Sequence, residues 1–119
     1  KVPSKDAWKW YAALDVFAVP RKDTEVCRTV TPLKPLMALA LGVPVVGSDL
    51  PAINEVTGNN LITHVPEDPK SLVQAIERAG EASSVEKQAL RSWAKSRTWE
   101  VNGQKYKDLF DGRFLANKT

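Results

Sequence analysis

The sequence predicts an α/β fold, a partial doubly wound (Rossmann-like) arrangement in which helices flank a three-stranded parallel sheet. Short apolar runs alternate three times with longer stretches of helical periodicity. These runs are apolar on both faces, as strands are when helices cover both sides of a parallel sheet. Three strands are few for such a sheet, so we expect the 119 residues to be a single fragment of a longer parent protein that supplies more strands upstream.

The first elements are predicted from caps and periodicity. Ser4 is a good N-cap, and aromatic residues recur at helical spacing after it, so residues 4–14 are expected to form a helix. The apolar run 15–19 follows and stops at Pro20, which is typical of a buried strand. Residues 21–31 are polar and irregular, and we expect a loop there.

The middle of the chain predicts one helix and two strands. A run of strong helix formers extends from Pro32 to Gly42, a residue suited to ending a helix. Residues 43–48 and 61–65 are apolar and are expected to be strands. Between them, residues 49–56 are expected to form a loop with about one helical turn.

Three further helices are predicted towards the C-terminus. Asp68 is an N-cap followed by Pro69 at the first helical position. Ser83 and Ser84 open a second helix, and Thr98 caps the last one.

The four tryptophans fall on predicted helices, so core packing is the expectation for them. Trp8 and Trp10 cannot share one helix face, and one of the two is expected to be exposed or covered by a partner.

Composition limits the classes of function. Apolar residues make up 43% of the chain and charged residues 26%, which is usual for a globular protein. The net charge of +3 is spread among interleaved acidic and basic residues, so we expect no nucleic-acid partner. A small positive balance does suit a partner that carries phosphates, such as a nucleotide or an anionic membrane surface. The single Cys27 fits a reducing, cytoplasmic location.

The most informative stretch for chemistry runs from Arg28 to Met37, where a polar loop leads into a predicted helix. A strand, a loop and a helix N-terminus can hold an anion at the carboxyl end of a parallel sheet. Arg28, Lys34 and free backbone N–H groups are therefore candidates for gripping a phosphate. Many such junctions bind nothing, so these residues alone leave a plain connecting loop as the alternative.

Several runs of residues cover nearly the whole chain. They are DVFAVPR at 15–21, VTPLKPL at 30–36 and ALALGVPVVGSDLP at 38–51, with shorter ones at 54–56, 61–66, 68–69 and 97–99. These runs resemble one family, the retaining GT-B glycosyltransferases of the glycogen-synthase and phosphatidylinositol-mannosyltransferase superfamily. The resemblance implies that the chain is the second half of the C-terminal, donor-binding domain. It also implies that the parent moves a sugar from a nucleoside-diphosphate sugar to an acceptor with retention.

The resemblance also implies roles for particular residues. Thr31, Leu33 and Lys34 match positions that approach the diphosphate and the base of the donor. Two family glutamates, the second of which binds the ribose hydroxyls, fall on Thr29 and Met37. A thioether cannot accept two hydroxyl hydrogen bonds as a carboxylate does, so ordinary ribose binding is in doubt. The alternative for Met37 is a helix residue packed in the core.

Together, the candidate residues for binding a nucleotide sugar are Arg28, Thr31, Leu33, Lys34 and Met37. The family's basic pair, glycine-rich turn and acceptor-side catalytic groups lie upstream. We therefore expect no catalytic residue, no metal site and no cofactor in this chain, and no activity from the chain alone.

Two polar residues outside that stretch are interpreted as structural rather than ligand-binding. Glu55 matches a family glutamate, but it is remote from the predicted phosphate site, which favours a hydrogen-bonded carboxylate that anchors a loop. His64 is a lone histidine on a predicted strand, and a structural role is favoured.

Two other classes of protein stay open. A non-catalytic interaction or regulatory domain that kept the glycosyltransferase fold would explain the non-acidic Thr29 and Met37. Another doubly wound nucleotide binder, such as a dehydrogenase or an epimerase, is disfavoured because the chain has no G-x-G-x-x-G turn.

The expected partners follow from the same reasoning. A nucleoside-diphosphate sugar should bind weakly or not at all to the chain alone. A homodimer is expected through strand 15–19, since its bare edge is a template for pairing. Peripheral association of the parent with a membrane is left open.

Overall fold

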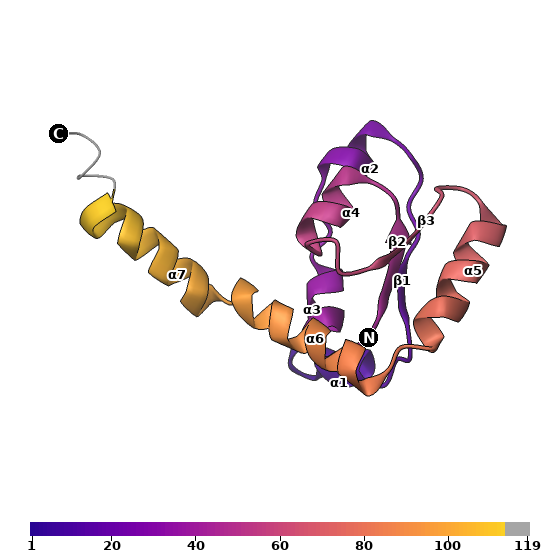
Figure 1. Ribbon diagram of the computed structural model, residues 1–119, viewed down its shortest axis with the longest axis horizontal. Helices are drawn as coiled ribbons and strands as arrows, with labels where there is room; N and C mark the ends of the chain where they lie inside the picture. The colour runs from indigo at the N-terminus through magenta and orange to yellow at the C-terminus, as the bar shows by residue number, and fades with distance from the viewer. Residues whose placement is uncertain (114–119) are drawn as a thin grey trace.

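The computed structural model describes residues 1–113. They form an α/β body from which the last helix extends outwards, so the molecule measures 56 × 33 × 32 Å (Figure 1). The strands are β1 (Phe17–Val19), β2 (Val45–Ser48) and β3 (Ile62–His64). The helices are α1 (Ala7–Ala12), α2 (Glu25–Thr29), α3 (Lys34–Ala40), α4 (Pro51–Val56), α5 (Pro69–Gly80), α6 (Ser84–Ala94) and α7 (Trp99–Asp108). Short 3₁₀ turns cover Ser4–Asp6 and Lys95–Arg97, and a π-helical turn covers Leu109–Arg113.

The three strands form one parallel sheet in the order β1-β2-β3. Phe17 is paired with Val45, and Val46 with Ile62. The central strand β2 is buried along its whole length. The predicted fold class is therefore confirmed, and the strands lie side by side in chain order.

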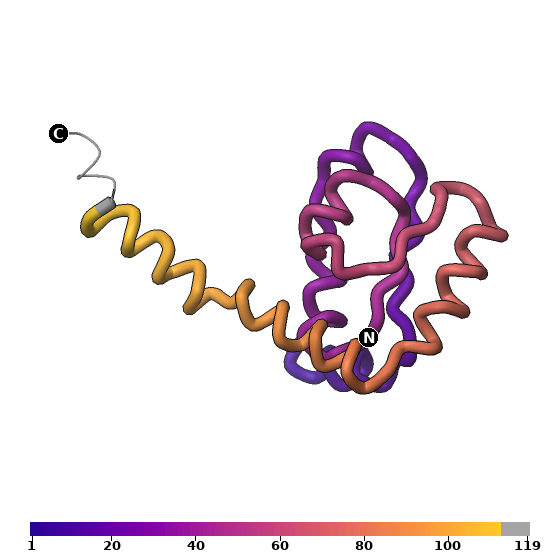
Figure 2. Tube along the Cα trace, in the orientation of Figure 1, coloured from indigo at the N-terminus to yellow at the C-terminus, as the bar shows by residue number. Residues whose placement is uncertain are grey.

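Helices cover the two faces of the sheet unequally. One face packs on α1, α3, α4 and α6, around a cluster that contains Leu39 and Val45 (Figures 1 and 2). Gly47 points towards this face, where an added Cβ would lie 3.0 Å from side-chain atoms of Ile53 and Leu61, so only glycine lets α4 approach so closely. Among the helices within residues 1–113, only α5 packs on the opposite face, where Val46 meets Ala75 and Ala79.

The three predicted caps of the later helices are confirmed. Each side chain accepts a hydrogen bond from a backbone N–H two or three residues into its helix, which satisfies one of the free donors there. Asp68 accepts from Ser71 at 3.2 Å, Ser83 from Glu86 at 3.2 Å and Thr98 from Val101 at 3.3 Å.

The first part of the chain differs from the prediction in three places. Ser4 lies inside a 3₁₀ turn rather than at an N-cap, and the expected helix over 4–14 is reduced to α1. The expected loop over 21–31 contains α2, which is capped by Thr24. The segment 49–56 is mostly helical, because Pro51 starts α4 at a position where a proline is well tolerated.

The expectation that tryptophans pack in the core holds only for Trp93, which packs against the core cluster from α6. Trp8 and Trp10 are both exposed, and it is Tyr11 that packs against the core cluster from the short helix α1. Trp99 is 85% exposed because it lies on α7, which extends away from the body (Figure 2).

Candidate functional site

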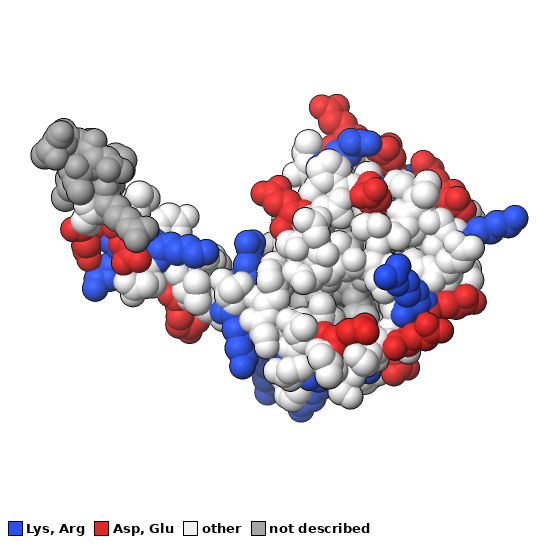
Figure 3. Space-filling model, viewed as in Figure 1, with Lys and Arg blue, Asp and Glu red and all other residues white. Residues whose placement is uncertain are grey.

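A groove of about 540 Å³ lies beside β1 and reaches the loop after its carboxyl end and the start of α3. Two cationic residues, Arg21 and Lys34, contribute to its lining, and no carboxylate does. Acidic and basic side chains are interspersed on the face of the molecule that is shown in Figure 3. The groove is lined by Tyr11, Phe17, Ala18, Val19, Pro20, Arg21, Pro32, Leu33, Lys34 and Pro35.

The structure brings two of the five candidate residues together in this groove. Leu33 and Lys34, at the start of α3, are both in its lining. Met37 lies one turn further along α3 and is 42% exposed, so packing in the core is not its role. Thr31 is exposed just before the helix, outside the lining.

The start of α3 offers fewer free N–H groups than an ordinary helix. Pro32 and Pro35 have none, and the N–H of Leu36 donates to the carbonyl of Leu33 at 3.1 Å. Any anion in the groove therefore depends more on side-chain charge than the sequence suggested.

Arg28, the fifth candidate, lies in α2 outside the groove lining and is paired with a carboxylate. Its Nε and Nη2 donate to the two carboxylate oxygens of Asp23, at 2.5 and 2.9 Å. The hydrogen bonds from Arg28 hold the pKa of the Asp23 carboxyl below its usual range. Arg28 and Lys34 thus do not line a common groove, and Arg28 instead closes the loop between Asp23 and α2.

Arg21 is the groove residue that sequence reasoning missed. Its backbone is held by Ser48, a fully buried residue at the end of β2. The Ser48 hydroxyl accepts a hydrogen bond from the Arg21 N–H at 2.6 Å and donates one to the Arg21 carbonyl at 2.7 Å. The available signal was local, since Arg21 is the first basic residue after the carboxyl end of a strand.

His64 and Glu55 are accounted for without a ligand. His64 Nδ1 lies 2.9 Å from the Val65 carbonyl, which only accepts, so that nitrogen carries the proton in a structural contact. Glu55 is exposed on α4, and within residues 1–113 its carboxylate makes no hydrogen bond or ion pair. The loop-anchoring role expected of Glu55 belongs instead to Asn54, whose amide donates to Asp49 at 2.9 Å.

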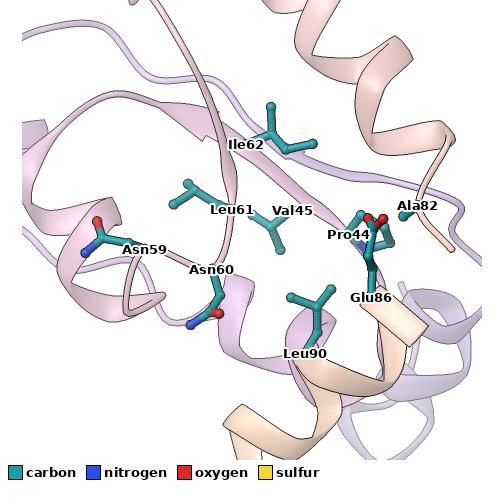
Figure 4. A pocket seen from close by; sticks show the side chains of 9 residues that line it. All are labelled: Pro44, Val45, Asn59, Asn60, Leu61, Ile62, Ala82, Glu86 and Leu90. Carbon is teal, nitrogen blue, oxygen red and sulfur yellow. The ribbon is translucent and has the colours of Figure 1, made fainter. Parts of the chain in front are cut away.

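A second pocket, of about 260 Å³, lies at the opposite end of the sheet, where β2 and β3 begin (Figure 4). Its wall is mainly aliphatic, with Val45, Leu61 and Leu90 facing one another and Glu86 at α6. It has no cationic lining residue, so it does not suit a phosphate.

Two general features complete the description of residues 1–113. No helix in that range is both long enough and apolar enough to cross a bilayer. The same residues contain no cluster of three or more His, Cys, Asp or Glu side chains that could hold a metal ion.

Comparison with known proteins gives one match. A family model described as glycosyl transferases group 1 matches residues 1–81, which include the whole sheet, the groove and α5. No curated protein and no solved structure matches the chain. The matched part is more than half of the 119 residues and contains the parallel sheet with the groove beside β1. The chain therefore belongs to the glycosyl transferases group 1 family.

Proposed function

We propose that this chain forms part of the donor-binding site of a glycosyltransferase, with the diphosphate of a nucleoside-diphosphate sugar in the groove beside β1. The observation that carries the proposal is the lining of that groove, which has two cations and no carboxylate. The groove runs beside β1 and reaches the carboxyl end of the parallel sheet, where ligands of open α/β folds usually bind. Membership of a glycosyltransferase family supports the same conclusion.

The chemistry that these residues can supply is electrostatic. When a glycosyl bond to a nucleoside diphosphate breaks, negative charge develops on the leaving diphosphate. Fixed cations beside that charge stabilise the transition state more than the ground state. Lys34 can act as a point charge and Arg21 as a planar donor fork, two complementary ways of holding phosphoryl oxygens.

We propose that transfer needs a larger parent protein and that the chain alone is inactive. The groove is open on the side where β1 has no neighbouring strand within residues 1–113. Its lining contains no carboxylate, histidine or cysteine that could act as a general base, and the ribose position suggested by the family resemblance is Met37. Binding of the nucleotide to the chain alone should therefore be weak.

Calorimetric or NMR titration of the chain with UDP and GDP tests the proposal. We expect dissociation constants of about 1 mM or weaker, equivalent to about 4 kcal/mol of binding free energy or less. A constant near 1 μM, about 8 kcal/mol, would be too strong for an incomplete site. If neither nucleotide at high millimolar concentration shifts any resonance of a groove residue, the groove is not a donor site.

The second candidate function is a non-catalytic interaction domain that retains the family fold. The observation that favours it is Met37, an exposed apolar side chain one turn along α3 from Lys34, at the position matched to the ribose-binding glutamate. An assay of the parent protein separates the two functions. A parent that transfers no sugar from any nucleotide sugar, while the chain still binds another protein, would favour the interaction domain.

A further inference from the structure

We infer that Arg21, rather than Arg28, is the arginine that binds the phosphates in the groove, and that Ser48 positions it. This inference rests on the proposed function, because it names the residues that would hold the diphosphate. It also reverses the choice made from sequence, where Arg28 and Lys34 were the two cations.

The two arginines differ in whether their guanidinium group is already paired with a carboxylate. Arg28 is engaged by both oxygens of Asp23, so binding a phosphate would first require breaking a bidentate pair. Among the ion pairs of residues 1–113, none involves Arg21 or Lys34. The residue Arg21 is half-buried, whereas Arg28 is exposed.

Arg21 stands between two hollows. On one side is the groove, which it lines with Lys34. On the other is a hollow of about 220 Å³ whose lining includes Glu67 and Asp68. The Asp68 carboxylate already caps α5 through the N–H of Ser71. An anion in the groove would meet Arg21, from the loop after β1, and Lys34, at the start of α3.

Ser48 fixes the direction in which the chain leaves β1. The β1–β2 pairing ends at Val19 and Gly47. The N–H of Phe17 donates to the Pro44 carbonyl of the neighbouring segment, and N–H groups that face β2 recur at every second residue, so the next one after β1 belongs to Arg21. Beyond this point the Ser48 hydroxyl replaces the backbone pairing: it accepts a hydrogen bond from the N–H of Arg21 and donates one to the carbonyl of Arg21. Removing this hydroxyl would leave both backbone groups without their partner and release the loop that carries Arg21.

The test is NMR titration of the 119-residue chain with inorganic pyrophosphate, UDP and GDP. Arg21→Gln and Arg28→Gln form a matched pair, since each lowers the formal net charge of +3 by one. We expect Arg21→Gln to weaken the binding of all three ligands about tenfold, as loss of a charge-assisted hydrogen bond predicts. Arg28→Gln should change binding less than about twofold, because long-range charge effects on exposed sites are screened.

Ser48→Ala tests positioning. We expect it to weaken pyrophosphate binding in the wild-type background, with no further loss in the Arg21→Gln background, because Ser48 acts through Arg21. Ser48→Thr keeps the hydroxyl and should retain most of the binding. Thermal unfolding of every variant identifies losses of binding that come from unfolding.

Four outcomes overturn the inference. Arg21→Gln that binds like the wild type, or Arg28→Gln that carries the loss instead, shows that Arg21 is not the phosphate ligand. Equal losses for Ser48→Ala in both backgrounds show that Ser48 does not act through Arg21. A wild-type chain that binds none of the three ligands overturns the proposed function itself, and this inference with it.

Discussion

The indole ring of Trp93 lies directly on the backbone of Gly58: a Cβ added to Gly58 would lie 2.5 Å from ring atom Cζ2. Gly58 also has a positive backbone φ of 56°, which residues other than glycine rarely adopt. Arg91, on the same helix, covers Gly42 in a similar way. The helix α6 thus docks on two glycine turns of the body, although it lies beyond the segment that matches the family model.

Gly58→Ala should destabilise the chain by about 1–3 kcal/mol, because the new methyl group displaces Trp93 and the backbone is strained. Gly80→Ala is the matched control, since an added Cβ there would meet no atom within 4 Å and no positive φ is involved. We expect the control to change stability by less than about 1 kcal/mol. Urea unfolding measures both. Equal stability of the two variants would show that the contact between Trp93 and Gly58 is not tight in solution.

Truncation from the C-terminus should show that α6 is needed for stable folding and that α7 is not. From α6, Leu90, Trp93 and Ala94 pack against the main core cluster, whereas α7 extends from the body. Each large apolar side chain contributes about 1.5–3 kcal/mol when fully buried, against a total stability of about 5–15 kcal/mol. Residues 1–97 should therefore keep a cooperative thermal transition, and residues 1–81 should lose it. A cooperative transition in the shorter chain would mean that the segment matched to the family folds without α6.

Association through the free edge of β1 is expected to give a homodimer or a larger assembly. Within residues 1–113, β1 pairs only with β2, and Ala18 is exposed in the middle of that edge strand. Ala18→Lys should yield a monomer because a charge on an edge strand opposes pairing. Thr63→Lys, on the exposed middle residue of β3, is the control and should leave the assembly unchanged. Light scattering at low micromolar concentration gives the mass; a wild-type mass of 13.1 kDa would show the expectation to be wrong.

Met37→Glu should strengthen nucleotide binding by restoring a carboxylate where the family resemblance suggests a ribose contact. Each charge-assisted hydrogen bond contributes about 1.5–3 kcal/mol, so affinity for UDP or GDP should rise at least about tenfold. Pyrophosphate has no ribose, and its affinity should not rise. Val85→Glu, an exposed apolar residue on α6, controls for the added charge. Equal gains or losses for all ligands would show that Met37 has no contact with a ribose.

Local signals in the sequence were sufficient for the strands and for the caps at Asp68, Ser83 and Thr98, because a cap involves neighbours two or three residues away. The helix α2 was missed because its five residues make little more than one turn and bury none of their side chains. A helix that short has almost no periodicity to read.

The candidate site was only partly predictable. Leu33 and Lys34 were found because they belong to a recognisable run before a helix. Arg21 was missed because its placement depends on Ser48, 27 positions further along the chain. Arg28 was wrongly chosen, since nothing in its own helix reveals that two of its guanidinium nitrogens, Nε and Nη2, donate to the Asp23 carboxylate in the preceding loop.

The order of the strands in the sheet follows their order in the chain, and this affects how the fold can grow. During synthesis, β1 and β2 can pair before β3 has left the ribosome, and each later strand–helix unit then adds to an edge that is already formed. The same strand order allows strands to be added on the N-terminal side of the sheet. A strand that precedes β1 can join its open edge without breaking an existing pair, so the sheet can be lengthened by whole units while its centre stays unchanged.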